Sequence, residues 1–169
     1  NGLQIDENGV TNTYHPTAVT STEGITDVDL VILFVKAIFS KVALEGNKNI
    51  IGEHTHLLTL QNGAGHEHLL MEYVPKERGV NGAVLGMGHV RRGGVGKTNA
   101  GMLVEDKEGF LAKMKESFDS CGFTLNVCDT IQQLIWDKLF TNVSLSAVTG
   151  ILQVDMGYIA ANPYAWNLT

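Results

Sequence analysis

The run DVDLVILFV at residues 27–35 constrains the fold more than any other feature, because residues 30–35 are all apolar. A strand with one face in water alternates apolar and polar residues, whereas a strand covered on both faces is apolar throughout. We therefore predict that residues 27–35 form a strand in the buried middle of a parallel sheet. Parallel strands need a crossover connection, so a helix is expected before the next strand.

The segments that follow have the rhythm of an α/β fold. Residues 37–44 are apolar at helical spacing, and residues 57–60 read as the next strand. Residues 67–73 then predict a short helix, and the apolar residues 80–88 predict a further strand. Strand, helix, strand, helix and strand in this order indicate a doubly wound sheet.

The first twenty residues predict three short strands. Residues 3–5 and 11–14 are separated by a turn at residues 7–9. Residues 18–20 read as the third strand, and Pro16 keeps this stretch at an edge because proline cannot donate to a sheet.

The pattern changes after the apolar strand at residues 80–88. Residues 89–103 are rich in glycine and predict a hairpin, which would add an antiparallel strand. Residues 106–121 predict an amphipathic helix, and residues 123–127 predict a last strand. Residues 131–150 then read as one long helix, so the predicted fold class is α/β with a helical end.

Charge and apolar run lengths exclude two classes of partner. The formal net charge of −6 disfavours nucleic acid, and the longest apolar run, residues 30–35, is too short to span a membrane. Cys121 and Cys128 are interpreted as structural thiols of a reduced, cytoplasmic protein. The sequence starts without Met and stops inside a predicted helix, so we expect an internal piece of a longer protein.

A series of polar residues lies within the apolar face of the long helix at residues 131–150. Lys138, Asn142, Ser146 and Thr149 are three or four residues apart, so they stack along one side; we call them the polar ladder. A lysine there either extends its ammonium to the edge of the core or serves a pocket that uses its charge. Asparagine and serine beside it favour a binding pocket lined with donors.

Two polar residues follow neighbouring strands of the predicted sheet. Lys36 comes directly after the strand at residues 27–35, and Asn62 follows the strand at residues 57–60. Ligands of open α/β sheets bind outside the carboxyl ends of the strands. Alone, Asn62 is explained by a turn and Lys36 by a solvated strand end, but together they suggest a site.

The two His-x-His pairs are not predicted to form a metal site. His54 and His56 precede the strand at residues 57–60, whereas His66 and His68 follow it. Zinc ligands must converge on one ion, and these pairs are expected at opposite ends of the strand. No Gly-x-Ser-x-Gly motif is present to support a serine nucleophile.

Four segments carry a specific combination of motifs: DLVILFVKA, LTLQNGAGHEHLL, YVPKERGVNGAVLG and IWDKLFTNVSLSAVTG. In this order and spacing they resemble the ketopantoate reductase (2-dehydropantoate 2-reductase) family, and the similarity covers nearly the whole chain. The resemblance implies reduction of ketopantoate to pantoate with NADPH, on the route to pantothenate and coenzyme A. A homodimer is left open.

The resemblance also implies roles for residues on the substrate side. Lys138 would be the general acid, whose ammonium donates a proton to the carbonyl oxygen and stabilises the developing alkoxide. Asn142 would bind the substrate. Ser146 stands where the family often has asparagine, and its hydroxyl would still bond a substrate oxygen. Asn62 would lie between nicotinamide and substrate.

On the cofactor side, the resemblance places Lys36 near NADP and the backbone at residues 86–88, with Gly88, close to it. It implies an incomplete Rossmann-type sheet over residues 1–128 as a partial NADP-binding domain. Residues 129–169 would begin an all-helical domain for substrate binding and dimerisation.

The sequence departs from the family pattern at its ends. The Gly-x-Gly-x-x-Gly phosphate loop is absent and is expected before Asn1, while the remaining helices are expected after Thr169. Without the central first strand, residues 30–35 would be exposed, so we expect these 169 residues alone to bind NADPH poorly and to be inactive.

Two other functions remain open from the sequence. Ser146 permits a related reductase that acts on another small 2-keto acid. A non-catalytic nucleotide-binding protein of the same fold is the third hypothesis, but such a protein has no need for Lys138 among apolar residues.

Overall fold

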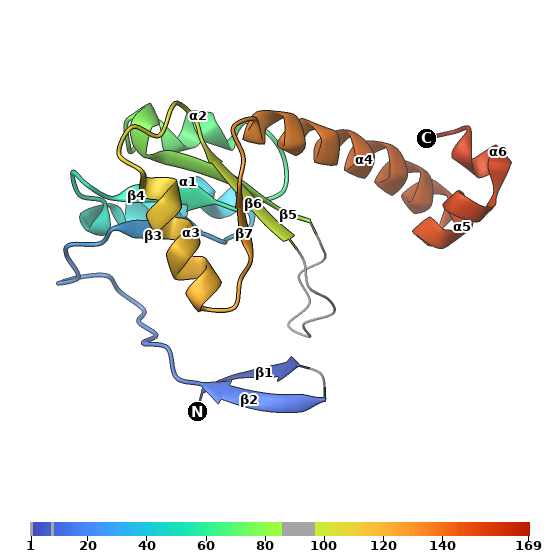
Figure 1. The fold of residues 1–169 in the computed structure, drawn as a ribbon. Helices are drawn as coiled ribbons and strands as arrows, with labels where there is room; N and C mark the ends of the chain where they lie inside the picture. Colours follow the sequence, from blue (N-terminus) through green and yellow to red (C-terminus); the bar gives the residue numbers. More distant parts are fainter. Residues whose placement is uncertain (1, 8, 86–96) are drawn as a thin grey trace.

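The computed structural model describes residues 2–7, 9–85 and 97–169, and its centre is a five-stranded sheet (Figure 1). The strands, in spatial order, are β3 (Leu30–Leu33), β4 (His56–Thr59), β5 (Gly79–Leu85), β6 (Lys97–Met102) and β7 (Leu125–Val127). All neighbours are parallel except β5 and β6, which are antiparallel. The predicted α/β class and the antiparallel addition are therefore confirmed.

Strand β4 shows why the sheet is covered on both faces. Successive side chains of a strand point to opposite sides, so Leu57 and Leu58 enter different cores. Leu58 packs in a cluster with Val80, Leu111 and others on the α3 side, whereas Leu57 packs with a second cluster that includes Leu44. Burial on both faces explains why this strand is not alternating.

Short helices cover the Leu57 face and a longer one covers the Leu58 face. The helices are α1 (Ser40–Gly46), α2 (His66–Leu70) and α3 (Phe110–Ser120), with single 3-10 turns η1 (Ala37–Phe39), η2 (Lys48–Ile50) and η3 (Lys76–Arg78). Helix α3 starts where the carboxylate of Asp106 accepts bonds from the backbone N–H groups of Phe110 and Leu111, at 3.0 and 2.8 Å. These bonds satisfy donors that the first turn of a helix leaves open.

The carboxyl-terminal part of the chain is helical and extends away from the sheet (Figure 1). Helix α4 (Ile131–Leu152) contacts β5 and β6, and it is followed by α5 (Met156–Ala161) and α6 (Pro163–Trp166). The predicted helix at residues 131–150 is thus confirmed and is two residues longer. Among the helices described, none is long and apolar enough to cross a membrane.

The amino-terminal residues form a separate hairpin of β1 (Leu3–Glu7) and β2 (Val10–Tyr14), which are antiparallel. These two strands match the prediction, and Asn8 of the predicted turn lies outside the described residues. The strand predicted at residues 18–20 is wrong, because residues 15–20 have no regular secondary structure. A β-like pattern in so short a segment forms a strand only where a partner strand is available.

The strand predicted at residues 27–35 is shorter than expected and lies at the edge of the sheet instead of its middle. It spans only Leu30–Leu33, and no strand among the described residues pairs with its second edge. Asp27, with φ of 60°, is in the left-handed region, so regular strand geometry begins after it. Because β3 is at the end of the strand order, the prediction of a buried middle position is wrong for the described residues. The exposure expected for this run when no first strand covers it is seen at Ile32, Phe34 and Val35, which are 38%, 67% and 38% exposed.

Candidate active site

The carboxyl edge of the sheet and helix α4 together form a small, open depression. We call it the Lys138 depression, and it is lined by Gln61, Asn62, Gly63, Ile135, Lys138, Leu139 and Asn142. Three residues singled out from the sequence therefore lie around one space, although they come from two distant segments. Two come from the polar ladder on α4 and one from the loop after β4.

The turn after β4 brings Asn62 to this edge. Gly63 and Gly65 have φ of 108° and 90°, a backbone conformation that residues with a Cβ rarely adopt. The carbonyl oxygen of Asn62 lies 3.0 Å from Nε2 of His66, which is in the first turn of α2. The Asn62 side chain is exposed at the mouth of the depression, so a ligand can reach its amide.

Lys138 is half-buried on α4 among apolar neighbours that include Ile135 and Leu139. Burial disfavours the charged ammonium and lowers the pKa of Lys138 below its ordinary value. Asn142 lies one helical turn further along the same face and is also half-buried. This arrangement offers an ammonium and two amides to a small ligand with oxygen acceptors.

The other predicted site residues do not line this depression. Lys36 is exposed after β3, at the start of η1, and Ser146 is exposed on α4 beyond Asn142. Thr149, the last member of the polar ladder, donates to the carbonyl oxygen of Leu145 at 2.9 Å. Gly88 lies outside the described residues.

Gln61 also lines the depression, although the sequence motifs single out only its neighbour Asn62. Its side chain bonds to Thr59, to Ser40 and to the carbonyl oxygen of Val35, which connects the segments after β3 and β4. Its position directly after a buried strand was the available signal, since the carboxyl edge was already expected to hold the site.

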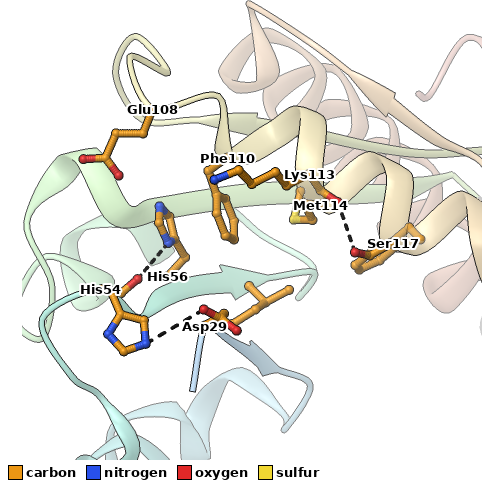
Figure 2. Close-up of a pocket in the computed structure, with 10 residues that line it drawn as sticks. Asp29, His54, His56, Glu108, Phe110, Lys113, Met114 and Ser117 are labelled. Atoms are coloured by element: carbon orange, nitrogen blue, oxygen red, sulfur yellow. Dashed lines mark hydrogen bonds and ion pairs between the residues drawn. The ribbon is translucent and has the colours of Figure 1, made fainter. Parts of the chain in front are cut away.

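A larger hollow of about 420 Å³ lies at the opposite end of the sheet, between helix α3 and the first residues of β3 and β4 (Figure 2). We call it the His56 hollow. The ring of His56 stacks on Phe110 with centroids 3.4 Å apart, and burial lowers the pKa of His56. Nε2 of His54 lies 3.9 Å from the carboxylate of Asp29 at the rim.

The His56 hollow contains none of the predicted site residues. It is at the amino ends of the parallel strands, whereas ligands of open α/β sheets bind at the carboxyl ends. Within the described part of the chain, no three His, Cys, Asp or Glu side chains come together as a metal site. Size alone therefore does not make this hollow the candidate active site.

The chain matches known proteins over most of its length. Residues 1–104 match the model of the ketopantoate reductase PanE/ApbA family. A 2-dehydropantoate 2-reductase from Pyrococcus horikoshii is 34% identical over 167 residues, which cover 96% of this chain and 54% of that relative. The chain thus spans about half the length of the curated relatives it matches.

Two solved structures resemble the fold closely. The ternary structure of D-mandelate dehydrogenase with NADH and anilino(oxo)acetate has a TM-score of 0.83 and 27% identity, over 96% of this chain and 55% of that one. A putative 2-dehydropantoate 2-reductase from Enterococcus faecalis has a TM-score of 0.73 and 28% identity, over 99% and 56%. These similarities extend over both the sheet and the helices that follow it.

Proposed function

The chain belongs to the ketopantoate reductase family, and on that premise we propose that it is part of an NADPH-dependent 2-dehydropantoate 2-reductase. The reaction would reduce the keto group of ketopantoate to the hydroxyl of pantoate, on the route to pantothenate and coenzyme A. One observation carries this proposal, which is the position of Lys138, Asn142 and Asn62 around a single depression at the carboxyl edge of the sheet.

The proposed reaction needs a proton for the carbonyl oxygen, and Lys138 supplies it. Its ammonium donates one proton to the oxygen while hydride arrives at the carbonyl carbon, so a 2-keto acid becomes a 2-hydroxy acid. A pKa lowered by burial makes that proton easier to release. The same positive charge stabilises the oxygen while negative charge develops on it.

Asn142 and Asn62 are proposed to hold the substrate. An amide donates and accepts, so it can bind both the carboxylate and the hydroxyl oxygens of a hydroxy acid. Asn62 would also lie against the nicotinamide. Ser146 is proposed as a further substrate contact, although it is not among the residues that line the Lys138 depression.

A nicotinamide cofactor would supply the hydride when bound. Lys36 fits its negatively charged phosphates, because the ammonium is exposed at the carboxyl end of β3, on the edge where dinucleotides bind. NADH in the related D-mandelate dehydrogenase structure supports a nicotinamide cofactor, and the preference for NADP is our proposal. We further propose residues 1–128 as the cofactor-binding part and residues 129–169 as the start of a helical domain.

The second candidate is a reductase for another 2-keto acid. It is favoured by the similarity to D-mandelate dehydrogenase, whose structure holds anilino(oxo)acetate. The exposed Ser146, in place of the asparagine often found in the family, also permits a different substrate. A non-catalytic nucleotide-binding protein is the third candidate.

Activity of a family-length protein that carries this chain separates the three candidates. Lys138→Ala is expected to lower kcat by roughly 10²–10⁴-fold, as loss of a general acid does. Lys107→Ala, which changes an exposed lysine far from the depression, serves as the control and should keep the wild-type rate. NADPH and NADH oxidation are followed with ketopantoate and with aromatic 2-keto acids.

Each candidate predicts a different result. The leading proposal is supported if kcat/KM is highest with ketopantoate and if kcat falls in Lys138→Ala. Highest kcat/KM with an aromatic keto acid supports the second candidate. Unchanged kcat in Lys138→Ala would show that Lys138 is not the general acid. If NADPH binds but no keto acid is reduced, the third candidate, a non-catalytic nucleotide-binding protein, is supported.

A further inference from the structure

Gln61 connects two loops at the carboxyl edge of the sheet. Its Nε2 donates to the carbonyl oxygen of Val35 at 2.5 Å and to Oγ of Ser40 at 2.7 Å. Its Oε1 accepts from Oγ1 of Thr59 at 3.0 Å. A primary amide has two N–H donors, so both are engaged here, and the carbonyl oxygen also has a partner.

The bonds to Ser40 and Thr59 end in the interior, whereas the bond to Val35 lies at the surface, where Val35 is 38% exposed. Ser40 is 1% exposed and Thr59 is 2% exposed, so the hydroxyl groups that Gln61 contacts lie in the interior. A buried polar group that loses its partner is not compensated by solvent. The buried hydroxyl groups of Ser40 and Thr59 therefore orient the side-chain amide of Gln61 toward the carbonyl oxygen of Val35.

The bonds of Gln61 end next to the two residues proposed for cofactor and substrate. Val35 directly precedes Lys36, and Gln61 itself directly precedes Asn62. Gln61 also lines the Lys138 depression. One amide thus restrains the backbone on the side of the proposed cofactor contact and on the side of the proposed substrate contact.

We infer that Gln61 is a positioning residue that fixes the loops after β3 and β4 relative to each other, and thereby holds Lys36 and Asn62 at a constant separation. This inference rests on the proposed function for its effect on turnover. Gln61 need not touch the substrate. It acts through the backbone of its neighbours, so its loss should displace Asn62 without removing any group that reacts.

Gln61→Met in a family-length protein tests the inference, because methionine fills similar space and has no N–H donor. Displacing a substrate-positioning group by about 1 Å costs up to roughly 10²-fold, so we expect kcat/KM for the keto acid to fall about 10–100-fold. Tyr73→Phe is the matched control. It removes a 2.8 Å bond from the tyrosine hydroxyl to Glu45 on the same face of the sheet and should leave kcat/KM unchanged.

A double-mutant cycle with Asn62→Ala separates positioning from general stability. If Gln61 acts through Asn62, Gln61→Met should cost less than about threefold in kcat/KM once Asn62 is already alanine, because coupled residues are not additive. Fully additive effects would overturn the inference. A lower Tm with unchanged kcat/KM in Gln61→Met would do the same.

Hydrogen exchange gives a readout that does not depend on turnover. Backbone amides of residues 34–39 and 61–65 should exchange faster in Gln61→Met than in the wild type, while exchange of the α4 amides should stay the same. In Tyr73→Phe, exchange of the amides in both loops should equal that of the wild type. Unchanged exchange in both loops overturns the inference even if the protein reduces no keto acid. If Gln61→Met does not fold, Ser40→Ala removes one of the three bonds, and the same comparison of exchange rates decides.

Discussion

Replacing Gly101 by alanine should destabilise the junction between the sheet and helix α4. Gly101 is buried in β6, where it pairs with Asn81 of β5. A Cβ added there would lie 2.4 Å from the carbonyl oxygen of Cys128 and 2.8 Å from Cβ of Ile131. Ile131 is the first residue of α4 and is 1% exposed, so its side chain is packed on all sides.

The size of the effect follows from these distances. Ordinary contacts of a Cβ begin at 3.4 Å, so the carbonyl oxygen of Cys128 would be 1.0 Å too close. Relief requires movement of backbone, because the clashing atom is not the end of a flexible side chain. Overpacking of this kind costs about 1–3 kcal/mol. For a chain of 169 residues this lowers Tm by roughly 2–12 °C.

Thermal unfolding followed by circular dichroism measures this change, and Gly150→Ala is its control. Gly150 lies within α4, and a Cβ built there meets no atom within 4 Å. Alanine is a better helix former than glycine by about 0.5–1 kcal/mol, so this variant should melt above the wild type. The reasoning is refuted if Gly101→Ala melts at the wild-type temperature, or if Gly150→Ala is destabilised to the same extent.

Two charged side chains give further stability predictions. Burial lowers the pKa of Lys138 in the folded chain, so the unfolded chain binds more protons between the folded and unfolded pKa values, and stability rises with pH across that window. The free energy of unfolding of Lys138→Met, measured in urea, should therefore exceed that of the wild type most at neutral pH, and the difference should shrink by about pH 10.4. A difference that does not change with pH would contradict this prediction. Asp106→Ala removes two bonds to the first turn of α3 and should lower the free energy of unfolding by about 1 kcal/mol, whereas Glu116→Ala on the exposed side of α3 should leave it unchanged. Equal urea midpoints for Asp106→Ala and Glu116→Ala would show that the cap contributes nothing.

Local patterns were sufficient where neighbours along the chain decide the structure. The helical spacing of residues 131–150 predicted α4, because side chains three and four apart share a face in any helix. The turn at residues 7–9 predicted the hairpin of β1 and β2 for the same local reason. By contrast, residues 18–20 have a strand-like pattern but are irregular, because a strand needs hydrogen-bond partners from elsewhere in the chain.

The apolar run at residues 27–35 shows the limit of a composition argument. Its lack of alternation correctly indicated a parallel strand, and β3 is parallel to β4. Which strand lies on its other side depends on the order of strands in the sheet, and that order is not encoded in the run itself. In the described residues β3 is therefore an edge strand, with Phe34 exposed after it.

For the candidate site, the sequence by itself determined that Lys138 and Asn142 share one face of a helix and that Asn62 follows a strand. Only the tertiary structure decided that these three residues border the same depression, that Ser146 does not line it, and that Gln61 connects the loops beside them. The physical reason is one of distance along the chain. Helical spacing is set by bonds between near neighbours, whereas the meeting of α4 with the loop after β4 depends on how the helix packs against β5 and β6.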